Sequence, residues 1–387
     1  MRVCLAYDCL YPWTVGGAER WYRGLAERLA ADGHEVTYLT RRQWPVDEPP
    51  AIPGVRVVVV SRADDLYGAD GNRRVRPPLR FGWGVLRHLL RRGRDYDVVH
   101  LASFPYFSVL AAAAARRHGR YRLVVDWFEV WSSDYWREYL GGVGGRVGHA
   151  VQRLCARVPQ TALCFSRVHE RRLVDEGLRG PHTVIGGLYA GGLTAPVAAP
   201  ADPLIVFAGR QIREKHAPAV VAAIARVRER GLDVRGAILG DGPERPGVLE
   251  AIEAHGLEGI VEAPGFVDAA EVDDAMRRAL CLLHPSSREG YGLVVVEAAA
   301  HGTPAIVVEG PDNAAVELIE PGVNGLVAAS IDADVLADAI LAVHEAGIGL
   351  RERTCTWFAQ NAERLSLGRS LDLVAGAYEG LSITTMP

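Results

Sequence analysis

Hydrophobic residues in this chain gather in short runs that are separated by longer amphipathic segments. In the first half the runs predict strands at residues 2–7, 35–41, 55–61, 96–103, 122–128, 161–166 and 182–187. The segment 14–36 places Trp21, Leu25 and Leu29 at i, i+4 and i+8, which predicts an amphipathic helix. Strands that alternate with helices are typical of a parallel sheet with both faces covered.

A stretch rich in Pro, Ala and Gly interrupts this alternation at 189–203, and the same pattern then restarts. The second half predicts strands at 204–210, 259–267, 279–287, 303–310 and 324–330 and a strand and turn at 234–243, with helices between them and a helical tail at 357–381. We therefore expect an α/β fold with two doubly wound, Rossmann-like domains that face each other across a cleft. The expected bounds are 1–190 and 204–360 for the domains, 191–203 for a linker, and 361–387 for a C-terminal helix that packs back on the first domain.

Length and composition are those of a globular protein. The chain has 387 residues, which favours two domains, and its net charge of −4 argues against nucleic acid as a partner. No apolar run approaches the ~20 residues of a membrane span, and the polar N-terminus differs from a signal peptide, so we expect a cytoplasmic protein. The six cysteines lack metal or disulfide spacing and are expected to be buried thiols. The sequence predicts no oligomeric state.

Ligands of doubly wound sheets bind beyond the carboxyl ends of the strands, so the strand–helix turns hold the candidate residues. Gly16 and Gly17 form the first such turn. Glycines let a backbone approach a ligand closely, and a helix N-terminus offers free N–H groups to an anion. A tight turn without a ligand explains the same two residues.

Arg210 and Lys215 follow the first predicted strand of the second half, and Lys215 is the only lysine among 43 Lys and Arg residues. Two cations at the end of a strand suit a diphosphate, because arginine offers a planar fork and lysine a compact charge. A solvated surface pair is the alternative.

Glu289 and Glu297 flank a glycine-rich turn that opens a predicted helix. The amides of this turn can hold phosphate oxygens, and they belong to Gly290, Tyr291, Gly292 and Leu293. A carboxylate before the turn can accept sugar hydroxyls, and one inside the helix can accept a ribose diol. A fourth turn, Gly265, Phe266 and Val267, can present backbone groups to the edge of a base.

Taken together, these motifs resemble the retaining nucleotide-sugar glycosyltransferases of family 4, whose two-domain architecture is called GT-B. The matching pieces are GRQIREK, GDGP, GFV, the pair Glu289 and Glu297, and HGTPAIV followed by NGLV, all within 205–327, and VGGAER in the first half. The resemblance implies sugar transfer with retention and without a required metal or cofactor. It assigns Arg210 and Lys215 to the donor diphosphate, Glu297 to the ribose, and Glu289 to the sugar hydroxyls near the reacting face.

The first half departs from the family pattern. Many members carry a histidine after the strand that corresponds to 122–128, and here Phe128 occupies its approximate place. Asp126 or Glu129 can take over a polar role, or these residues belong only to loop and core. The candidates on the acceptor side are therefore His100, Asp126, Phe128 and Glu129.

Three other features have simpler explanations. Asp332 and Asp334 resemble a metal-binding DxD motif, but Asp332 fits a helix N-cap better, and no metal is expected. The GGVGG segment, 141–145, predicts a mobile loop. The basic run 73–94 can touch an anionic membrane or an acidic acceptor, and a solvated face is the favoured interpretation.

The sequence thus predicts a retaining glycosyltransferase with a nucleotide-diphosphate sugar donor, with UDP favoured over GDP on prevalence alone. The favoured acceptor is a small hydroxylated metabolite or natural product. A lipid-linked or membrane-surface acceptor is the rival, and a non-catalytic subunit that binds a nucleotide sugar is a second alternative.

Overall fold

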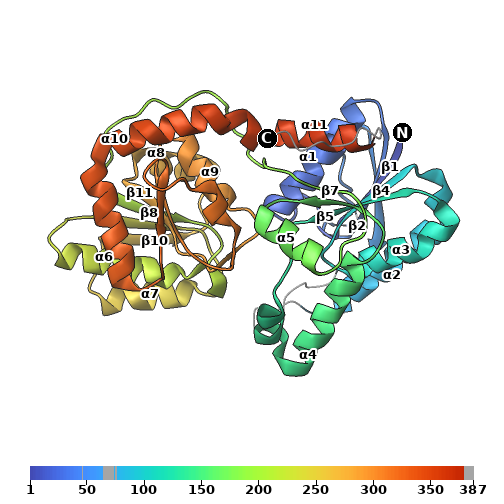
Figure 1. Ribbon diagram of the computed structural model, residues 1–387, viewed down its shortest axis with the longest axis horizontal. Coiled ribbons are helices and arrows are strands. Elements are labelled where there is room, and N and C mark those ends of the chain that lie inside the picture. Colours follow the sequence, from blue (N-terminus) through green and yellow to red (C-terminus); the bar gives the residue numbers. More distant parts are fainter. Residues whose placement is uncertain (46, 64–73, 75, 379–387) are drawn as a thin grey trace. The chain divides into compact units, whose positions relative to one another are not determined.

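The computed structural model describes residues 1–45, 47–63, 74 and 76–378. The chain divides into two compact units (Figure 1). The first consists of Met1–Leu188 and Leu367–Pro387, and the second of Tyr189–Ser366. The chain therefore leaves the first unit once and returns to it for its last helix.

Within the described residues, the first unit is built on a seven-stranded parallel sheet of order β3-β2-β1-β4-β5-β6-β7. Its strands are β1 (Arg2–Ala6), β2 (Glu35–Arg41), β3 (Val55–Ser61), β4 (Val98–Ala102), β5 (Arg122–Trp127), β6 (Thr161–Cys164) and β7 (His182–Val184). Its helices are α1 (Gly17–Ala31), α2 (Arg76–Arg92), α3 (Phe107–Gly119), α4 (Ser133–Ala156), α5 (Arg167–Asp175) and α11 (Leu367–Tyr378), with the short 3-10 helix η1 (Gly93–Asp95).

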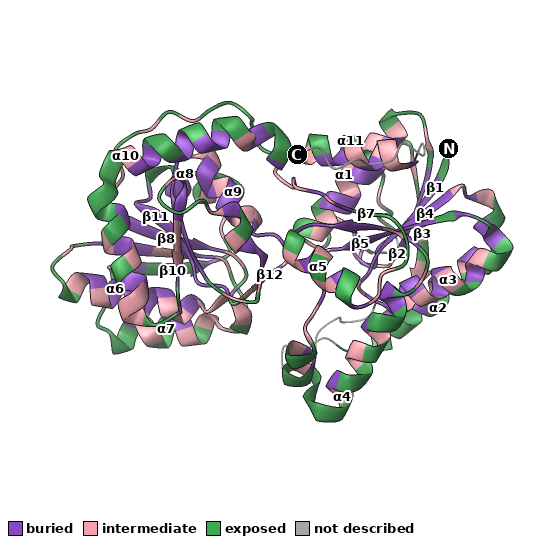
Figure 2. Ribbon diagram, viewed as in Figure 1, coloured by how far each residue is buried: buried purple, intermediate pink, exposed green. Residues whose placement is uncertain are grey.

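Helices cover both faces of this sheet because successive strand residues alternate between them. In β1, Val3 and Leu5 pack with α1 and α11, whereas Cys4 and Ala6 belong to the cluster with α2 and α3. The predicted stripe of α1 is buried on one of these faces. Buried residues accordingly gather on the strands, while the helices keep an exposed side (Figure 2).

The second unit contains, in its described residues, a six-stranded parallel sheet of order β10-β9-β8-β11-β13-β15. Its strands are β8 (Leu204–Ala208), β9 (Arg235–Leu239), β10 (Val261–Gly265), β11 (Cys281–His284), β13 (Ala305–Val308) and β15 (Gly325–Ala328), and a separate pair is formed by β12 (Arg288–Glu289) and β14 (Asp312–Asn313). Its helices are α6 (Ala217–Glu229), α7 (Arg245–Ala254), α8 (Ala269–Arg278), α9 (Leu293–Ala300) and α10 (Ala333–Leu365), with η2 (Arg213–Lys215) and η3 (Ala314–Leu318).

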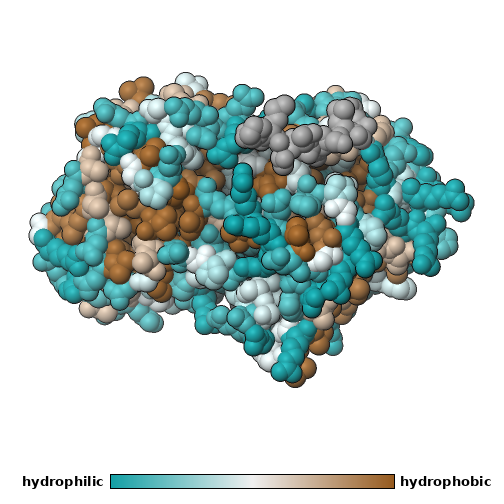
Figure 3. Space-filling view, viewed as in Figure 1, coloured by the Kyte–Doolittle hydropathy of each residue, from teal (hydrophilic) through white to brown (hydrophobic). Residues whose placement is uncertain are grey.

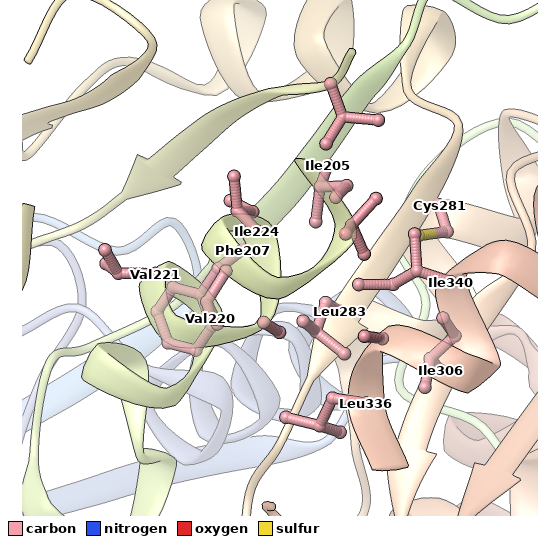
Figure 4. Packing of buried hydrophobic residues seen from close by; sticks show 14 of the residues in the cluster. Ile205, Phe207, Val220, Val221, Ile224, Cys281, Leu283, Ile306, Leu336 and Ile340 are labelled. Atoms are coloured by element: carbon pink, nitrogen blue, oxygen red, sulfur yellow. The ribbon is translucent and has the colours of Figure 1, made fainter. Parts of the chain in front are cut away.

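The core of the second unit lies between the sheet and its helices (Figure 4). Ile205 of β8 and Leu283 of β11 pack with Ile224 of α6 and Ile340 of α10, and each of these side chains is fully buried. The expectation of doubly wound parallel sheets is confirmed for both halves of the chain.

One sequence prediction about helices is wrong, and another needs different bounds. Residues 141–145 are not a loop but part of α4, which Ser132 caps and which bends at Gly141. Glycine disfavours helix, but Gly148 lies against the Trp136 ring, where an added Cβ would approach ring carbons to 2.4 Å. The glycines therefore let Trp136 pack against its own helix.

The predicted tail helix also divides. Residues 357–365 continue α10 in the second unit, Ser366 is extended, and only α11 belongs to the first unit. On α1, Arg28 pairs with Asp372 of α11 at 2.6 Å. Residues 191–203 have no helix or strand and belong to the second unit. Residues 379–387 lie outside the described part of the chain.

Candidate functional site

The carboxyl ends of β8 and β11 mark the point where the strand order of the second sheet reverses. The chain runs outward from β8 through β9 to β10, and then returns to β11 on the other side of β8. Loops that leave neighbouring strands in opposite directions leave a crevice between them, and ligands of doubly wound sheets bind there. The loop after β8 carries Arg210 and Lys215, and the segment after β11 carries Glu289.

Lys215 and Glu289 meet at this reversal point. The Lys215 ammonium donates to Glu289 Oε1, and His284 Nε2 shares the same oxygen at 2.5 Å. The exposed fractions of the three side chains are 19% for Lys215, 11% for Glu289 and 2% for His284. Because a carboxylate only accepts, the His284 nitrogen that faces it carries the proton.

The electrostatics of the cluster keep Glu289 ionised. Burial raises the pKa of Glu289, but the charges and hydrogen bonds of Lys215 and His284 outweigh burial and hold this pKa well below its usual 4.5. The site therefore presents a fixed carboxylate beside a fixed ammonium.

Hydrogen bonds between the two loops hold this pair in register. The Glu214 carbonyl accepts from the Ser287 amide at 2.9 Å and from the Ser286 hydroxyl at 3.1 Å. The Glu214 carboxylate pairs with Arg288 at 3.3 Å. The residues beside Lys215 and Glu289 thus join the two loops. The relative position of Lys215 and Glu289 is therefore fixed by these hydrogen bonds as well as by their own ion pair.

The turn after Glu289 is shaped by close packing. Gly292 has a φ of 97° and begins α9, and an added Cβ there would lie 2.6 Å from Ala315 Cβ. Only glycine fits both the left-handed backbone and this approach. Tyr291 is buried, whereas Gly290 and Leu293 are half-buried, so the predicted amide cradle lies at the N-terminus of α9.

Glu297 lies in α9, one turn beyond Leu293, and is half-buried. Burial raises the pKa of the Tyr189 hydroxyl, with a further contribution from the charges of Asp273 and Glu297. Tyr189 therefore lies in the electrostatic field of Glu297.

Gln211 connects the loop of Arg210 to the turn after β9. Its amide donates to the Asp241 carbonyl at 2.9 Å and its side chain to the Gly240 carbonyl at 2.7 Å. Gly240 in turn donates to the carbonyl of Gly265, at the end of β10. The GRQ, GDG and PGF segments thus form one hydrogen-bonded layer at the carboxyl edge of the sheet.

At the outer end of this layer, Phe266 is 78% exposed and Val267 is half-buried. At its inner end, the side chain of Arg210 is exposed. The structure thus brings the donor-side residues predicted in the second half to one edge of one sheet.

In the first unit, Gly16 and Gly17 lie at the N-terminus of α1, beyond the carboxyl end of β1. An added Cβ at Gly17 would meet no heavy atom within 4 Å, and one at Gly16 would meet only the flexible end of Glu19. Packing within the described residues therefore does not require glycine at either position.

Of the two alternatives that the sequence left open for the acids on the acceptor side, the surroundings of Asp126 fit a place in the core. Asp126 is fully buried, and its two oxygens accept from Trp21 Nε1 and His100 Nε2, each at 2.7 Å. His100 Nδ1 faces the Tyr378 hydroxyl of α11 at 2.5 Å. These contacts tie β4, β5, α1 and α11 together, so Asp126 and His100 are not placed to touch an acceptor.

Phe128 and Glu129, which follow β5, are half-buried. The Phe128 ring stacks on Phe165, with centroids 4.3 Å apart, and Glu129 accepts from Trp131 Nε1 at 2.7 Å. Of the two acids that were candidates for an acceptor contact, only Glu129 retains some exposure.

Sequence reasoning missed His284 and Ser286. The signal was present, because LLHPSSRE places a histidine five residues before Glu289. It could not be used without knowing that the segment after β11 folds back on itself.

The remaining sequence expectations concern metals, thiols and membranes. Asp332 caps α10 by accepting from the Asp334 amide at 2.9 Å, as expected. All six cysteines are buried. Among the described residues, no group of three His, Cys, Asp or Glu side chains is arranged to hold a metal ion. In the same part of the chain, every helix is too short or too polar to cross a bilayer.

Two family models match the chain. The model described as "Glycosyl transferase 4-like domain" matches residues 16–187, and the one described as "Glycosyl transferases group 1" matches residues 195–363. The matched ranges cover most of both units.

Two curated proteins are similar in sequence. Glycogen synthase of Mycobacterium tuberculosis is 26% identical over 342 residues, which cover 79% of this chain and 77% of that protein. Alpha-D-kanosaminyltransferase of Streptomyces kanamyceticus is 30% identical over 186 residues, which cover 47% of this chain and 46% of that protein.

Many solved structures share the fold, among them the following two. Sucrose-phosphate synthase from Thermosynechococcus elongatus has a TM-score of 0.80 at 19% identity and covers 98% of each chain. HepE of Anabaena, solved in complex with UDP-glucose, has a TM-score of 0.72 at 17% identity and covers 98% of this chain and all of that one. The expected GT-B fold is thereby confirmed.

Proposed function

Because the chain belongs to the group 1 glycosyl transferases, and is thus an enzyme that transfers glycosyl groups, we propose that its donor is a nucleotide-diphosphate sugar. The donor binds at the carboxyl edge of the second sheet. The observation that carries this proposal is the cluster of Lys215, Glu289 and His284 beside the N-terminus of α9. A half-buried cation, a fixed carboxylate and helix amides together suit a ligand with both phosphates and hydroxyls.

Each residue of the cluster has a separate role in the proposal. Lysine has three N–H donors, so Lys215 can keep Glu289 as a partner and still bind the diphosphate. Arg210 binds the same diphosphate from the exposed side of the loop. Glu289 accepts hydroxyls of the donor sugar, and Glu297 accepts the ribose diol. The backbone at Gly265, Phe266 and Val267 meets the base.

The proposed reaction retains the configuration of the anomeric carbon. The bond between this carbon and the diphosphate oxygen breaks, and the acceptor oxygen bonds to the same face. The acceptor proton passes to the leaving diphosphate, so no protein base is needed. Lys215 and Arg210 stabilise the negative charge that develops on the diphosphate, which is the main source of acceleration in such a step. No metal is required in this scheme.

UDP is the proposed nucleotide, supported by the UDP-glucose complex of HepE. The proposed acceptor is a small hydroxylated metabolite or natural product, supported by the similarity to a kanosaminyltransferase. A lipid-linked acceptor remains as the second candidate, because helix α2 of the first unit carries an exposed apolar and cationic face.

A thermal-shift screen tests the donor site. UDP, GDP, UDP-sugars and GDP-sugars are added to the purified protein. A ligand at 100 times its Kd stabilises the folded state by about 2.7 kcal/mol. We expect UDP and one UDP-sugar to raise the Tm of the wild type and to lose this effect in Glu297→Ala. If no nucleotide stabilises the protein, the donor proposal is wrong. The anomeric configuration of the product, measured by NMR, tests retention separately.

A further inference from the structure

Helix α2 of the first unit presents three rows of side chains. One row, which includes Phe81, Val85 and Leu89, is buried against the unit. The helix packs on β3 and α3, since an added Cβ at Gly84 would strike the Val60 carbonyl and one at Gly82 would strike Phe107. This row accounts for how α2 is held in the fold.

A second row is apolar but exposed. Leu79, Trp83, Leu86 and Leu90 follow one another at i, i+4, i+7 and i+11, so they form one stripe along the helix. The exposed fractions are 46% for Leu79, 67% for Trp83 and 51% for Leu90, and Leu86 is half-buried. Exposed tryptophan flanked by leucine is costly to keep in water and is unexplained by packing within the described residues.

The third row is cationic. Arg76, Arg80, Arg87 and Arg91 lie beside the apolar stripe, and all four side chains are exposed. Neither α2 nor the neighbouring α3 contains an aspartate or glutamate, although the chain as a whole has a net charge of −4. Positive charge is therefore concentrated along these two helices.

We propose that the exposed face of α2, formed by the apolar stripe and the arginine row, docks the first unit onto anionic lipid. A helix that lies in a membrane interface has an apolar face with Trp or Leu and a polar face rich in Lys or Arg. Charge complementarity selects anionic lipid, because each arginine near such a surface strengthens binding about fivefold.

Apolar exposure alone would not carry this inference. Figure 3 shows hydrophobic residues at the surface of the second unit as well, and scattered exposure is normal. What distinguishes α2 is that its stripe is continuous and bordered by arginines without acids. On α5, by comparison, the exposed Val174 stands beside Asp175, and Glu170 lies in the same helix.

The proposal does not depend on the proposed donor or acceptor, since it concerns binding to lipid and not catalysis. It reverses the interpretation of the basic run 73–94 as a solvated face. Positions 73 and 75 of that run lie outside the described residues, and the proposed face lies entirely within 76–92.

The test is co-sedimentation of the full chain with vesicles. One set is phosphatidylcholine alone, and the other contains a third of phosphatidylglycerol. We expect binding to the anionic vesicles only, and loss of binding as salt rises from about 0.1 M to 1 M, which shortens the Debye length from about 10 Å to 3 Å. The variant Arg80→Glu/Arg87→Glu should bind at least ~30-fold more weakly, and Trp83→Ser should also bind weakly.

A matched control comes from α5 in the same unit. Val174 has an exposed fraction of 47%, close to that of Leu79, and Arg171 is exposed on the same helix. Arg171→Glu/Val174→Ser should leave vesicle binding unchanged. Circular dichroism and donor hydrolysis should remain at wild-type values in all variants, which shows that they fold.

Two results would overturn the proposal. The first is failure of the wild type to bind anionic vesicles, and the second is binding that the α2 variants do not weaken. If the wild type instead elutes as an oligomer that Trp83→Ser dissociates, without vesicle binding, the face is a protein interface and the lipid proposal is wrong.

Discussion

Lys215 and Glu289 form an ion pair although they are 74 positions apart in the sequence. The pair lies at the carboxyl ends of β8 and β11, where the strand order of the second sheet reverses. Both side chains are largely shielded from water, so removing either one leaves a poorly solvated charge. This geometry supplies a physical reason for the only lysine of the chain, because a compact ammonium fits a site that His284 already crowds.

We expect Lys215→Ala to lower kcat/KM by on the order of 10²-fold, the usual cost of losing one charge-stabilising contact in a transition state. Lys215→Arg should recover only part of the activity, because the planar fork is larger than the ammonium and does not fit the space beside His284. Initial rates with saturating acceptor and varied donor measure both effects. Arg213→Ala, an exposed position in the same loop, serves as the control. Wild-type rates in Lys215→Arg would mean that the choice of lysine is incidental.

Glu297→Ala should weaken nucleotide binding by roughly 1–3 kcal/mol, the cost of a lost charged hydrogen-bond acceptor. Glu289→Gln should instead lower turnover while free nucleotide still binds, because its proposed contact is with the sugar. Isothermal titration with UDP, alongside turnover rates, separates the two variants. An equal loss of nucleotide affinity in both would contradict this division of roles.

The depressed pKa of Glu289 predicts a pH dependence of stability. A carboxylate whose folded pKa lies below its unfolded value stabilises the fold above the unfolded value, about 4.5 here, and this contribution is lost as pH falls through the folded pKa. The difference in unfolding free energy between wild type and Glu289→Gln should therefore be largest at neutral pH and shrink below pH 4.5. Urea titrations at several pH values measure it.

Glu250→Gln is the matched control for this experiment, because Glu250 is exposed on α7. The unfolding free energy of Glu250→Gln should stay close to that of the wild type at every pH. A difference for Glu289→Gln that does not change with pH would show that Lys215 and His284 do not hold Glu289 ionised.

Most secondary structure could be predicted from the sequence because apolar runs bounded by polar residues are a local property. The run at 55–61 is β3, and the run at 35–41 is β2. The helix at 141–145 could not be predicted, because glycine disfavours helix and because Gly145 and the nearby Gly148 lie against Trp136 of the same helix. That contact is not visible in a propensity pattern.

The candidate site was predictable in its residues but not in its contacts. Lys215 and Glu289 stand out as motifs, whereas their pairing depends on strand order, which brings β11 beside β8. Asp126 shows the opposite case. The sequence leaves open whether this residue contacts an acceptor or belongs to the core, and the register of β5 turns it inward to Trp21 and His100.

This placement changes what we expect of Asp126, which lies in β5, and of Glu129, which follows it. Asp126→Asn should destabilise the first unit by about 1.5–3 kcal/mol, because one charged hydrogen bond to Trp21 or His100 is lost in the interior. The ratio of sugar transfer to donor hydrolysis should stay unchanged in the folded fraction. Glu129→Gln should leave stability near wild type and alter this ratio. Urea unfolding and paired measurements of transfer and hydrolysis rates test both statements. If only Asp126→Asn changed the ratio of transfer to hydrolysis, Asp126 and not Glu129 would be the residue that acts on the acceptor.

Gly17→Ala distinguishes a ligand-binding turn from a simple turn at the N-terminus of α1. The added methyl group would meet no atom within 4 Å, and position 17 is helical, where alanine is favoured over glycine by up to about 1 kcal/mol. The variant should therefore be as stable as the wild type or more stable. If the backbone at Gly17 approaches the donor, the same methyl group should obstruct it, and the KM for the donor should rise while the Tm does not fall. Gly376→Ala, on α11, also meets no atom within 4 Å and should change neither quantity. Unchanged kinetics in Gly17→Ala would mean that the glycines only form the turn, because a methyl group in contact with a bound substrate cannot be without effect.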